Sequence, residues 1–150
     1  MKLEKYTLTA SQKRTVFEFE SIGPKGAIPK IVVFQKMDTD KYFNLAFGDL
    51  NVETGDFNDL ATSDNGDSEK VLATVVQALK DFLTAYPNAN VYATGSNDIR
   101  TRLYRIGISL YGEETAEWLN IYGENDSGFE PFGSGKDYLG FLFTKKSTKL

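Results

Sequence analysis

The 150-residue sequence contains no cysteine and no histidine. The missing cysteine excludes disulfides, thiolate nucleophiles and thiolate zinc sites, and the missing histidine excludes every histidine-based catalytic triad or metal cluster. No apolar run approaches the roughly 20 residues that a transmembrane helix needs. The N-terminal residues MKLEKYTLTASQKR lack the apolar centre of a signal peptide. We therefore expect a cytoplasmic protein that does not enter a membrane.

Basic residues are outnumbered, because 17 lysines and arginines stand against 21 acidic residues and give a net charge of −4. Proteins that bind nucleic acid without sequence preference usually carry a basic surface, so this balance argues against that class. The charges are segregated, however. Residues 38–69 carry one lysine and nine acids, whereas residues 70–112 carry five basic and two acidic residues. Such blocks are typical of solvated loops, of acidic loops attracted to basic elements, or of a bipolar binding surface.

The length suits one domain over residues 1–150. Alternating or continuous apolar runs separated by short turns predict an antiparallel meander of strands at 5–10, 15–22, 28–37 and 42–50. Later strands are expected at 90–94, 115–123 and 138–144. Residues 51–67 and 124–136 are interpreted as acidic loops. The predicted fold is α+β, in the order ββββαβαββ, with a mostly antiparallel sheet and two helices packed on one face.

The first helix is predicted over residues 68–86. Its apolar residues recur at the spacing of one helical face, Asp67 or Ser68 is suited to the N-cap, and Pro87 ends the helix.

A second helix is predicted after Gly95 and the polar step Ser96-Asn97-Asp98. Its core face is expected to carry Ile99, Leu103, Ile106 and Leu110. The same spacing places Arg100 beside Tyr104 and Tyr111 on a flank, and Gly112 is expected to end the helix.

The start of this second helix is the candidate site. A helix N-terminus offers free N–H groups and partial positive charge, and arginine adds planar donors that suit phosphate or carboxylate. One hypothesis is that these residues bind a phosphate or nucleic-acid backbone, with an aromatic ring available for stacking. The other is that Arg102 pairs with Asp98, and Arg100 with the acidic loop, to hold the fold together. The residues that would bind the anion under the first hypothesis are Ser96, Asn97, Arg100, Arg102, Tyr104 and Arg105.

Other chemistries find little support in the sequence. The turn Gly23-Pro24-Lys25-Gly26 is not a Walker loop, because GxxxxGK[ST] is absent. A calcium loop starting at Asp49 would place Thr54 at the invariant glycine and Leu60 at the bidentate glutamate. A magnesium site, or a two-carboxylate hydrolase, built from acidic-loop residues such as Asp56, Asp59 and Asp64 stays open, although their spacing does not favour it. We predict no cofactor, metal-ligand set or catalytic residue.

Four motifs give the chain a resemblance to a family of uncharacterised bacterial proteins about 150 residues long. They are GPKG, NLxFGD, KVLATV and GSxxxRTRLY, and the resemblance covers essentially the whole chain. It implies family membership and assigns no activity. It adds Thr101 to the residues of the candidate site, and Lys25, Asn44 and Asp49 as secondary candidates.

Three functions remain as hypotheses. The first is non-enzymatic binding of an anionic partner, either a phosphate-bearing ligand or single-stranded nucleic acid, through the helix that carries Arg100 to Arg105. A ββββα order also occurs in single-strand-binding folds such as PUR repeats, which is an analogy of fold alone. The second is a protein-interaction module of a bacterial two-gene regulatory pair, in which the acidic loop 51–67 meets a basic partner. The third is a metal-assisted hydrolase or nuclease that uses carboxylates of that loop.

Overall fold

The computed structural model describes residues 4–58, 65–93, 98–133 and 135–146, and for residues 57–58, 98–104, 106 and 110 it describes the backbone without the side chains. Its elements in chain order are β1 Thr9–Ala10, β2 Val16–Gly23, β3 Gly26–Lys36, β4 Tyr42–Leu50, β5 Phe57–Asn58, α1 Ser68–Ala85, β6 Asn90–Ala93, α2 Asp98–Thr115, β7 Leu119–Asn125, β8 Gly128–Pro131 and β9 Gly140–Lys145.

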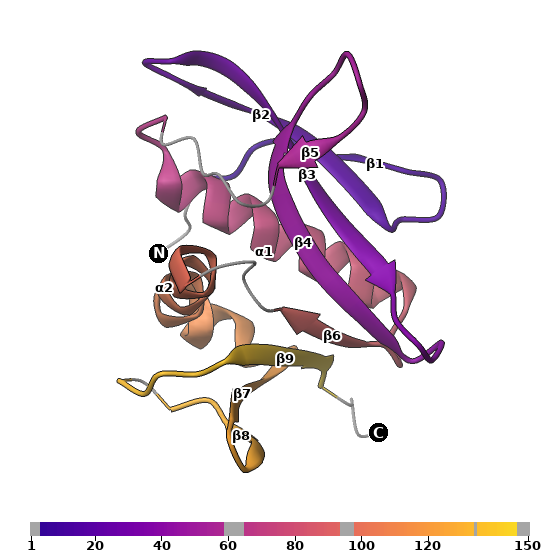
Figure 1. Cartoon of the computed structure of the whole chain (residues 1–150), viewed down its shortest axis with the longest axis vertical. Helices are drawn as coiled ribbons and strands as arrows, with labels where there is room; N and C mark the ends of the chain where they lie inside the picture. Colours follow the sequence, from indigo (N-terminus) through magenta and orange to yellow (C-terminus); the bar gives the residue numbers. More distant parts are fainter. Residues whose placement is uncertain (1–3, 59–64, 94–97, 134, 147–150) are drawn as a thin grey trace.

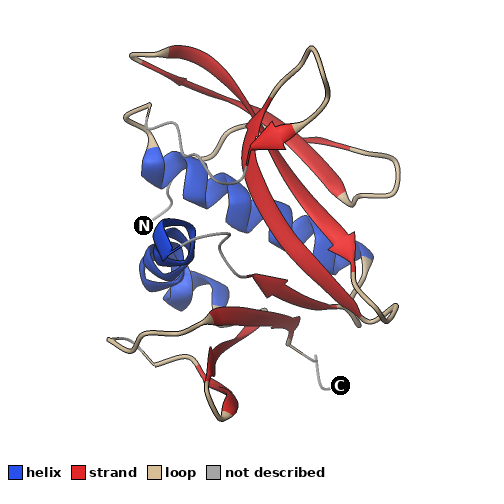
Figure 2. Ribbon diagram, viewed as in Figure 1, coloured by secondary structure: helices blue, strands red, loops and turns tan. Residues whose placement is uncertain are grey.

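The strands form one sheet in the order β1-β2-β3-β4-β6-β9-β7-β8, and β5 pairs with β4 beside this path. The pairing of β4 with β6 is parallel, and the other pairings are antiparallel. Both helices lie on the same side of the sheet (Figures 1 and 2). The predicted α+β architecture, with a mostly antiparallel sheet and helices on one face, is therefore confirmed.

The helix side of the sheet holds an aromatic core around Phe82 of α1. The Phe82 ring stacks on Phe34 of β3, with centroids 4.2 Å apart, and meets Phe43 of β4 edge-on at 5.0 Å. Nine residues of α1 are buried, which confirms its predicted apolar face. Strand β3 runs between β2 and β4, as its continuous apolar run predicted. The first pair between β3 and β4 joins Lys30 with Asp49, and Pro29 lies one residue before it. The missing N–H of Pro29 therefore removes no hydrogen bond between β3 and β4.

Helix α2 connects two strands that are not neighbours. Strand β9 pairs antiparallel with both β6 and β7 and lies between them, so β6 and β7 run in the same direction. Strands β4, β6 and β7 are therefore parallel to one another, and their carboxyl ends point toward the same edge of the sheet. Because α2 is the next element after β6, its N-terminus begins on the side of that edge (Figure 1).

Several predicted boundaries were wrong. The strand predicted at 5–10 is only the two-residue β1, Thr9–Ala10. The segment 51–67 is not wholly a loop, because β5 pairs with the end of β4. Residues 124–136 contain β8, which forms a hairpin with β7. Gly112 does not end α2, which continues to Thr115 because Gly112 keeps a negative φ and the helical ladder is uninterrupted. The predicted strand 115–123 consequently starts at Leu119.

Tyr111, which was predicted to lie beside Arg100 on a flank of α2, is buried. Its side chain is 3% exposed, packs with Leu72 and Ala73 of α1, and donates a hydrogen bond to the carbonyl of Glu69 at 2.7 Å. Burial, with the nearby carboxylates of Glu69 and Glu114, raises the pKa of Tyr111. The side chains of Ile99, Leu103, Ile106 and Leu110, predicted to face the core, lie outside the described residues. Within the described part of the chain, neither helix has the length and apolar character needed to cross a membrane.

Candidate functional site

The structure confirms the strand and the helix on either side of the turn around which the candidate site was predicted, and residues 94–97 between them lie outside the described residues. Strand β6 ends at Ala93 and α2 begins at Asp98. Ser96 and Asn97 lie outside the described residues. The backbone of the next four candidates belongs to the first two turns of α2, and their side chains lie outside the described residues. These four are Arg100, Thr101, Arg102 and Tyr104.

Arg105 is the candidate whose side chain the structure describes. Its Nη1 donates a hydrogen bond to Oδ1 of Asp137 at 2.6 Å, in an ion pair where the arginine side chain is 34% exposed and the aspartate 98% exposed. Exposed ion pairs contribute about 0–1 kcal/mol, because water screens the charges and two side chains must be ordered. The guanidinium of Arg105 is therefore a surface group held by a weak contact.

The three secondary candidates do not lie together. Lys25 occupies the turn between β2 and β3, where its backbone N–H donates to Oδ1 of Asn65 at 2.7 Å. Asn44 is in register with Tyr92 of β6, and both alternate with buried residues, so they lie on the sheet face away from the helices. Asp49 points to the helix side. These three residues consequently do not form one site.

Asp49 has a structural role that the sequence did not reveal. Its Oδ1 accepts a hydrogen bond at 2.5 Å from Nζ of Lys30, whose side chain is 3% exposed. The two residues are a register pair of β3 and β4. A buried ammonium is costly unless a carboxylate neutralises it, so Asp49 keeps Lys30 compatible with the core.

The turn Gly23-Pro24-Lys25-Gly26 is fixed by a buried asparagine. Asn65 is 2% exposed, and its Nδ2 donates to the carbonyl of Gly26 at 2.9 Å and to Oγ of Ser21 at 3.2 Å. The Asn65 backbone approaches Gly23 so closely that a Cβ at Gly23 would lie 2.0 Å from the Asn65 carbonyl oxygen. These contacts give the GPKG sequence a structural role, which is to clamp the β2–β3 turn against the chain entering α1.

Asp67 belongs to the same polar cluster. It occupies the N-cap position of α1 as predicted, but its side chain makes no capping hydrogen bond. Instead, its Oδ2 accepts hydrogen bonds from the hydroxyls of Ser21 and Tyr6, each at 2.5 Å. Burial and the hydrogen bond to Asp67 raise the pKa of Tyr6.

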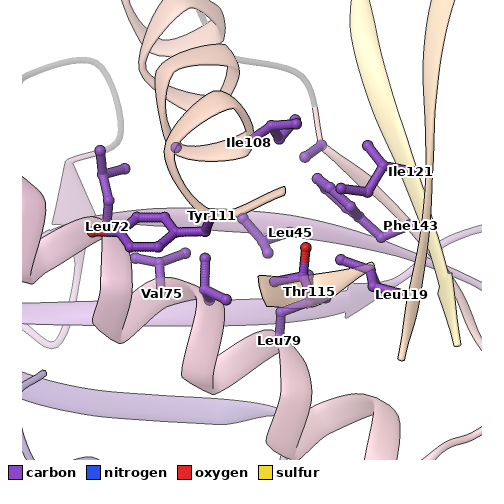
Figure 3. A pocket seen from close by; sticks show the side chains of 13 residues that line it. Leu45, Leu72, Val75, Leu79, Ile108, Tyr111, Thr115, Leu119, Ile121 and Phe143 are labelled. Carbon is purple, nitrogen blue, oxygen red and sulfur yellow. The ribbon is translucent and has the colours of Figure 1, made fainter. Parts of the chain in front are cut away.

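An apolar cavity lies between α1, α2 and the sheet. Its volume is about 50 Å³. Figure 3 shows leucine, isoleucine and phenylalanine side chains from the helices and from β4, β7 and β9 converging on it, with the ring of Tyr111 along one side. The labelled hydroxyls are those of Thr115 and Tyr111. The pattern of apolar residues predicted a core here, and nothing in the sequence signalled that the core would be incompletely filled.

A polar pocket of about 140 Å³ adjoins this cavity at the surface. Val76, Tyr111 and Thr115 line both spaces. The remaining walls of the polar pocket are formed by Lys5, Ala73, Gln77, Lys80, Glu114 and Trp118.

The described residues do not gather carboxylates into a metal site. No group of three or more acidic side chains among them is arranged to hold a metal ion. Of the acidic-loop residues considered from sequence, Asp56 is exposed, and Asp59 and Asp64 lie outside the described residues.

Comparison with known proteins gives one finding about kinship. The model of a family described as "Family of unknown function (DUF6934)" matches residues 2–146. No curated protein and no solved structure shows a significant match to the chain. The match to the family model spans nearly the whole sequence, and the chain therefore belongs to the family of unknown function DUF6934.

Proposed function

We propose that the protein binds an anionic partner, a phosphate-bearing ligand or single-stranded nucleic acid, through the first half of α2. The observation that carries the proposal is the surface position of Arg105, whose guanidinium pairs with the 98% exposed carboxylate of Asp137. Because such a pair contributes about 0–1 kcal/mol, a phosphate group can replace Asp137 at small cost. Arginine then offers two parallel N–H donors to the phosphate oxygens.

The position of α2 supports the same proposal. Its N-terminus follows β6 at the edge where the carboxyl ends of β4, β6 and β7 point, which is where ligands commonly bind in sheets with helical crossovers. The first backbone N–H groups of a helix lack intrahelical acceptors and favour anions. Arg102 is three positions before Arg105, and residues three apart are neighbours on a helix surface. In this proposal the anion is bound by Arg102 and Arg105 together with Ser96, Asn97, Arg100 and Thr101. The ring of Tyr104 stacks on a base.

A protein partner is the second candidate, and a different observation favours it. The sheet face away from the helices exposes two large side chains, Tyr42 on β4 and Phe129 on β8, which are 44% and 49% exposed. Phe129 packs edge-on against Tyr92, with ring centroids 6.2 Å apart. Exposed aromatic groups are enriched at protein interfaces.

The first proposal is tested by removing the two neighbouring arginines. Arg102→Ala with Arg105→Ala is compared with wild type for binding of pyrophosphate by calorimetry and of a fluorescent oligo(dT) by anisotropy. We expect binding to weaken about tenfold or more. A plot of the logarithm of the association constant against the logarithm of the salt concentration should become less steep, by the amount that corresponds to the loss of about two phosphate contacts. The matched control is Lys36→Ala with Lys41→Ala, which removes the same charge from the exposed β3–β4 turn and should leave binding unchanged.

Asp137→Ala separates a binding role of Arg105 from a structural one. If Arg105 binds the anion, removing its competing carboxylate should tighten pyrophosphate binding. If the arginines instead hold the fold together, their replacement would lower the melting temperature without changing anion binding, and the proposal would fail.

A further inference from the structure

The sheet face away from the helices, which we call the outer face, is almost free of charge along the neighbouring strands β4, β6, β9 and β7. The registers of these strands define rows of side chains that run across the outer face. One row holds Tyr42, Asn90, Thr144 and Asn120, and the next holds Asn44, Tyr92, Leu142 and Tyr122. Along these strands the described residues place a single charged side chain on the outer face. It belongs to Glu124, which accepts a hydrogen bond from the hydroxyl of Tyr92.

This composition is typical of a covered face. The solvent side of an antiparallel sheet usually carries polar and charged side chains, and parallel strands such as β4 and β6 are usually covered on both faces. In the described part of the chain, however, both helices lie on the other side of the sheet (Figures 1 and 2). Surfaces that are poor in charge and rich in tyrosine are typical of the cores of protein interfaces. The outer face therefore has the character of one half of an interface.

Neutral hydrogen-bonding groups are available in the middle of this face. Within the described part of the chain, the side-chain amide of Asn44 and the hydroxyls of Tyr42 and Tyr122 have no hydrogen-bond partner. The neighbouring amide of Asn120, by contrast, donates to Oγ1 of Thr144 at 3.2 Å. Asn44 is half-buried, and such an amide gains from a partner that completes its hydrogen bonds.

The lack of charge decides which partner suits the outer face. Single-stranded nucleic acid needs cations along its backbone, and the described residues of these four strands place none on this face. A strongly charged protein surface would leave its own charges without counter-charges. A second copy of the outer face is neutral as well. It brings two chains of net charge −4 together where neither of them carries its acidic excess.

We propose that two copies of the chain pack outer face to outer face, about a two-fold axis near Asn44. An amide offers both N–H donors and a carbonyl acceptor, so two asparagines that meet across the axis can form two hydrogen bonds. Stacked sheets lie about 10 Å apart, a distance that two asparagine side chains and the hydrogen bond between them can span. Tyr42 and Tyr122 then pack against the sheet of the other copy, and the helices lie on the outside of the dimer.

This inference rests on the second candidate function above, because it specifies the protein partner, and it is independent of anion binding by α2. Sedimentation equilibrium of the whole protein tests it. We expect a dimer with a dissociation constant of about 100 µM or lower. A protein that stays monomeric up to about 1 mM would overturn the proposal. The second candidate function would then survive only with an unlike protein as partner, and the pyrophosphate titration would still measure anion binding separately.

A charge exchange at Asn44 tests the position of the axis. Asn44→Asp and Asn44→Lys should each weaken self-association at least about tenfold, because like charges would meet across the axis. An equimolar mixture of the two variants should dimerise again, since a carboxylate then meets an ammonium, and this recovery also shows that both variants fold. The matched controls are Ala85→Asp and Ala85→Lys, at an exposed position of α1, which should dimerise like wild type. Wild-type association of either Asn44 variant alone, or a mixture that stays monomeric, would overturn the proposal.

Discussion

Lys30 and Asp49 are directly opposite each other on β3 and β4, and their side chains meet at 2.5 Å on the helix side of the sheet. The lysine is 3% exposed, whereas the aspartate is 22% exposed. The pair therefore places a cation in the core and its counter-charge at the margin of the core. Most of the cost of breaking the pair falls on the buried member.

Asp49→Ala should consequently be among the most destabilising single changes in the chain. It removes the carboxylate that Nζ of Lys30 contacts at 2.5 Å, and taking away one member of a buried pair costs about 3–5 kcal/mol in comparable proteins. Urea denaturation measures the loss. The double variant Lys30→Met with Asp49→Ala should recover much of it, because the buried ammonium is removed together with the carboxylate that it contacts. Failure of the second change to restore stability would argue against this account of the pair.

The two glycines Gly23 and Gly112 should respond in opposite ways to alanine. At Gly23 the new Cβ would lie 2.0 Å from the backbone oxygen of Asn65, so Gly23→Ala must displace the clamp on the β2–β3 turn and lower the melting temperature. At Gly112 a Cβ meets nothing within 4 Å inside α2, so Gly112→Ala should add about 0.5–1 kcal/mol. Thermal unfolding of the Gly23→Ala and Gly112→Ala variants measures the two effects. Equal changes in melting temperature would contradict the structure.

Tyr92 should make the stability of the protein sensitive to alkaline pH. Burial, the hydrogen bond from its hydroxyl to Glu124 and the charge of Glu124 raise the pKa of Tyr92 well above its ordinary value of 10.0. The folded state then keeps this proton where the unfolded state loses it. The contribution is full below pH 10 and declines as pH rises beyond it.

The comparison of wild type with Tyr92→Phe isolates this contribution. The difference between their unfolding free energies should be constant from pH 7 to about 9 and shrink above about 10, the unfolded pKa. Denaturant titrations at a series of pH values give this difference. A difference that grows with pH would show that Tyr92 ionises more easily in the folded protein, against the geometry.

Thr74 should govern the docking of the N-terminal segment onto α1. Its side chain is fully buried, its Oγ1 donates to the carbonyl of Lys70 at 2.7 Å, and it accepts from the backbone N–H of Tyr6 at 2.9 Å. Thr74→Val keeps the shape but leaves that N–H without its acceptor, so hydrogen exchange at Tyr6 should accelerate. Thr74→Ser keeps the hydroxyl and serves as control. Unchanged exchange in the valine variant would show that the segment is held elsewhere.

The order of apolar and polar residues within a segment correctly predicted those helices and strands that bury one face. Helix α1 follows from the apolar spacing and from Pro87, and β4 from its alternation, because one buried face dictates each pattern. Gly112 was misinterpreted because a glycine ends a helix only where the backbone turns to positive φ, and here it does not. The hairpin β7–β8 was missed, although Asn125 accepts from the N–H of Ser127 in a side-chain turn that Asn-Asp-Ser-Gly could have indicated.

The candidate site shows a different limit. Sequence spacing located the start of α2, but whether Arg105 points to solvent depends on α2 packing against α1 and on where Asp137 lies, 32 residues later. The Lys30–Asp49 pair and the Asn65 clamp join residues 19 and about 40 positions apart. The apolar cavity arises where α1, α2 and the sheet fit together incompletely. None of these relationships has a signature within a single segment.

The insertion of β9 between β6 and β7 has a consequence for biosynthesis. Both neighbours of β9 leave the ribosome before it does, so the hairpin β7–β8 has no edge to join until residues 140–145 emerge. The meander, α1 and β6 can assemble earlier around Phe82, which leaves β6 as a temporarily unpaired border. Nascent chains halted before residue 140 should therefore expose the edge of β6 to chaperones. Once β9 has emerged, it should pair with this edge and cover it.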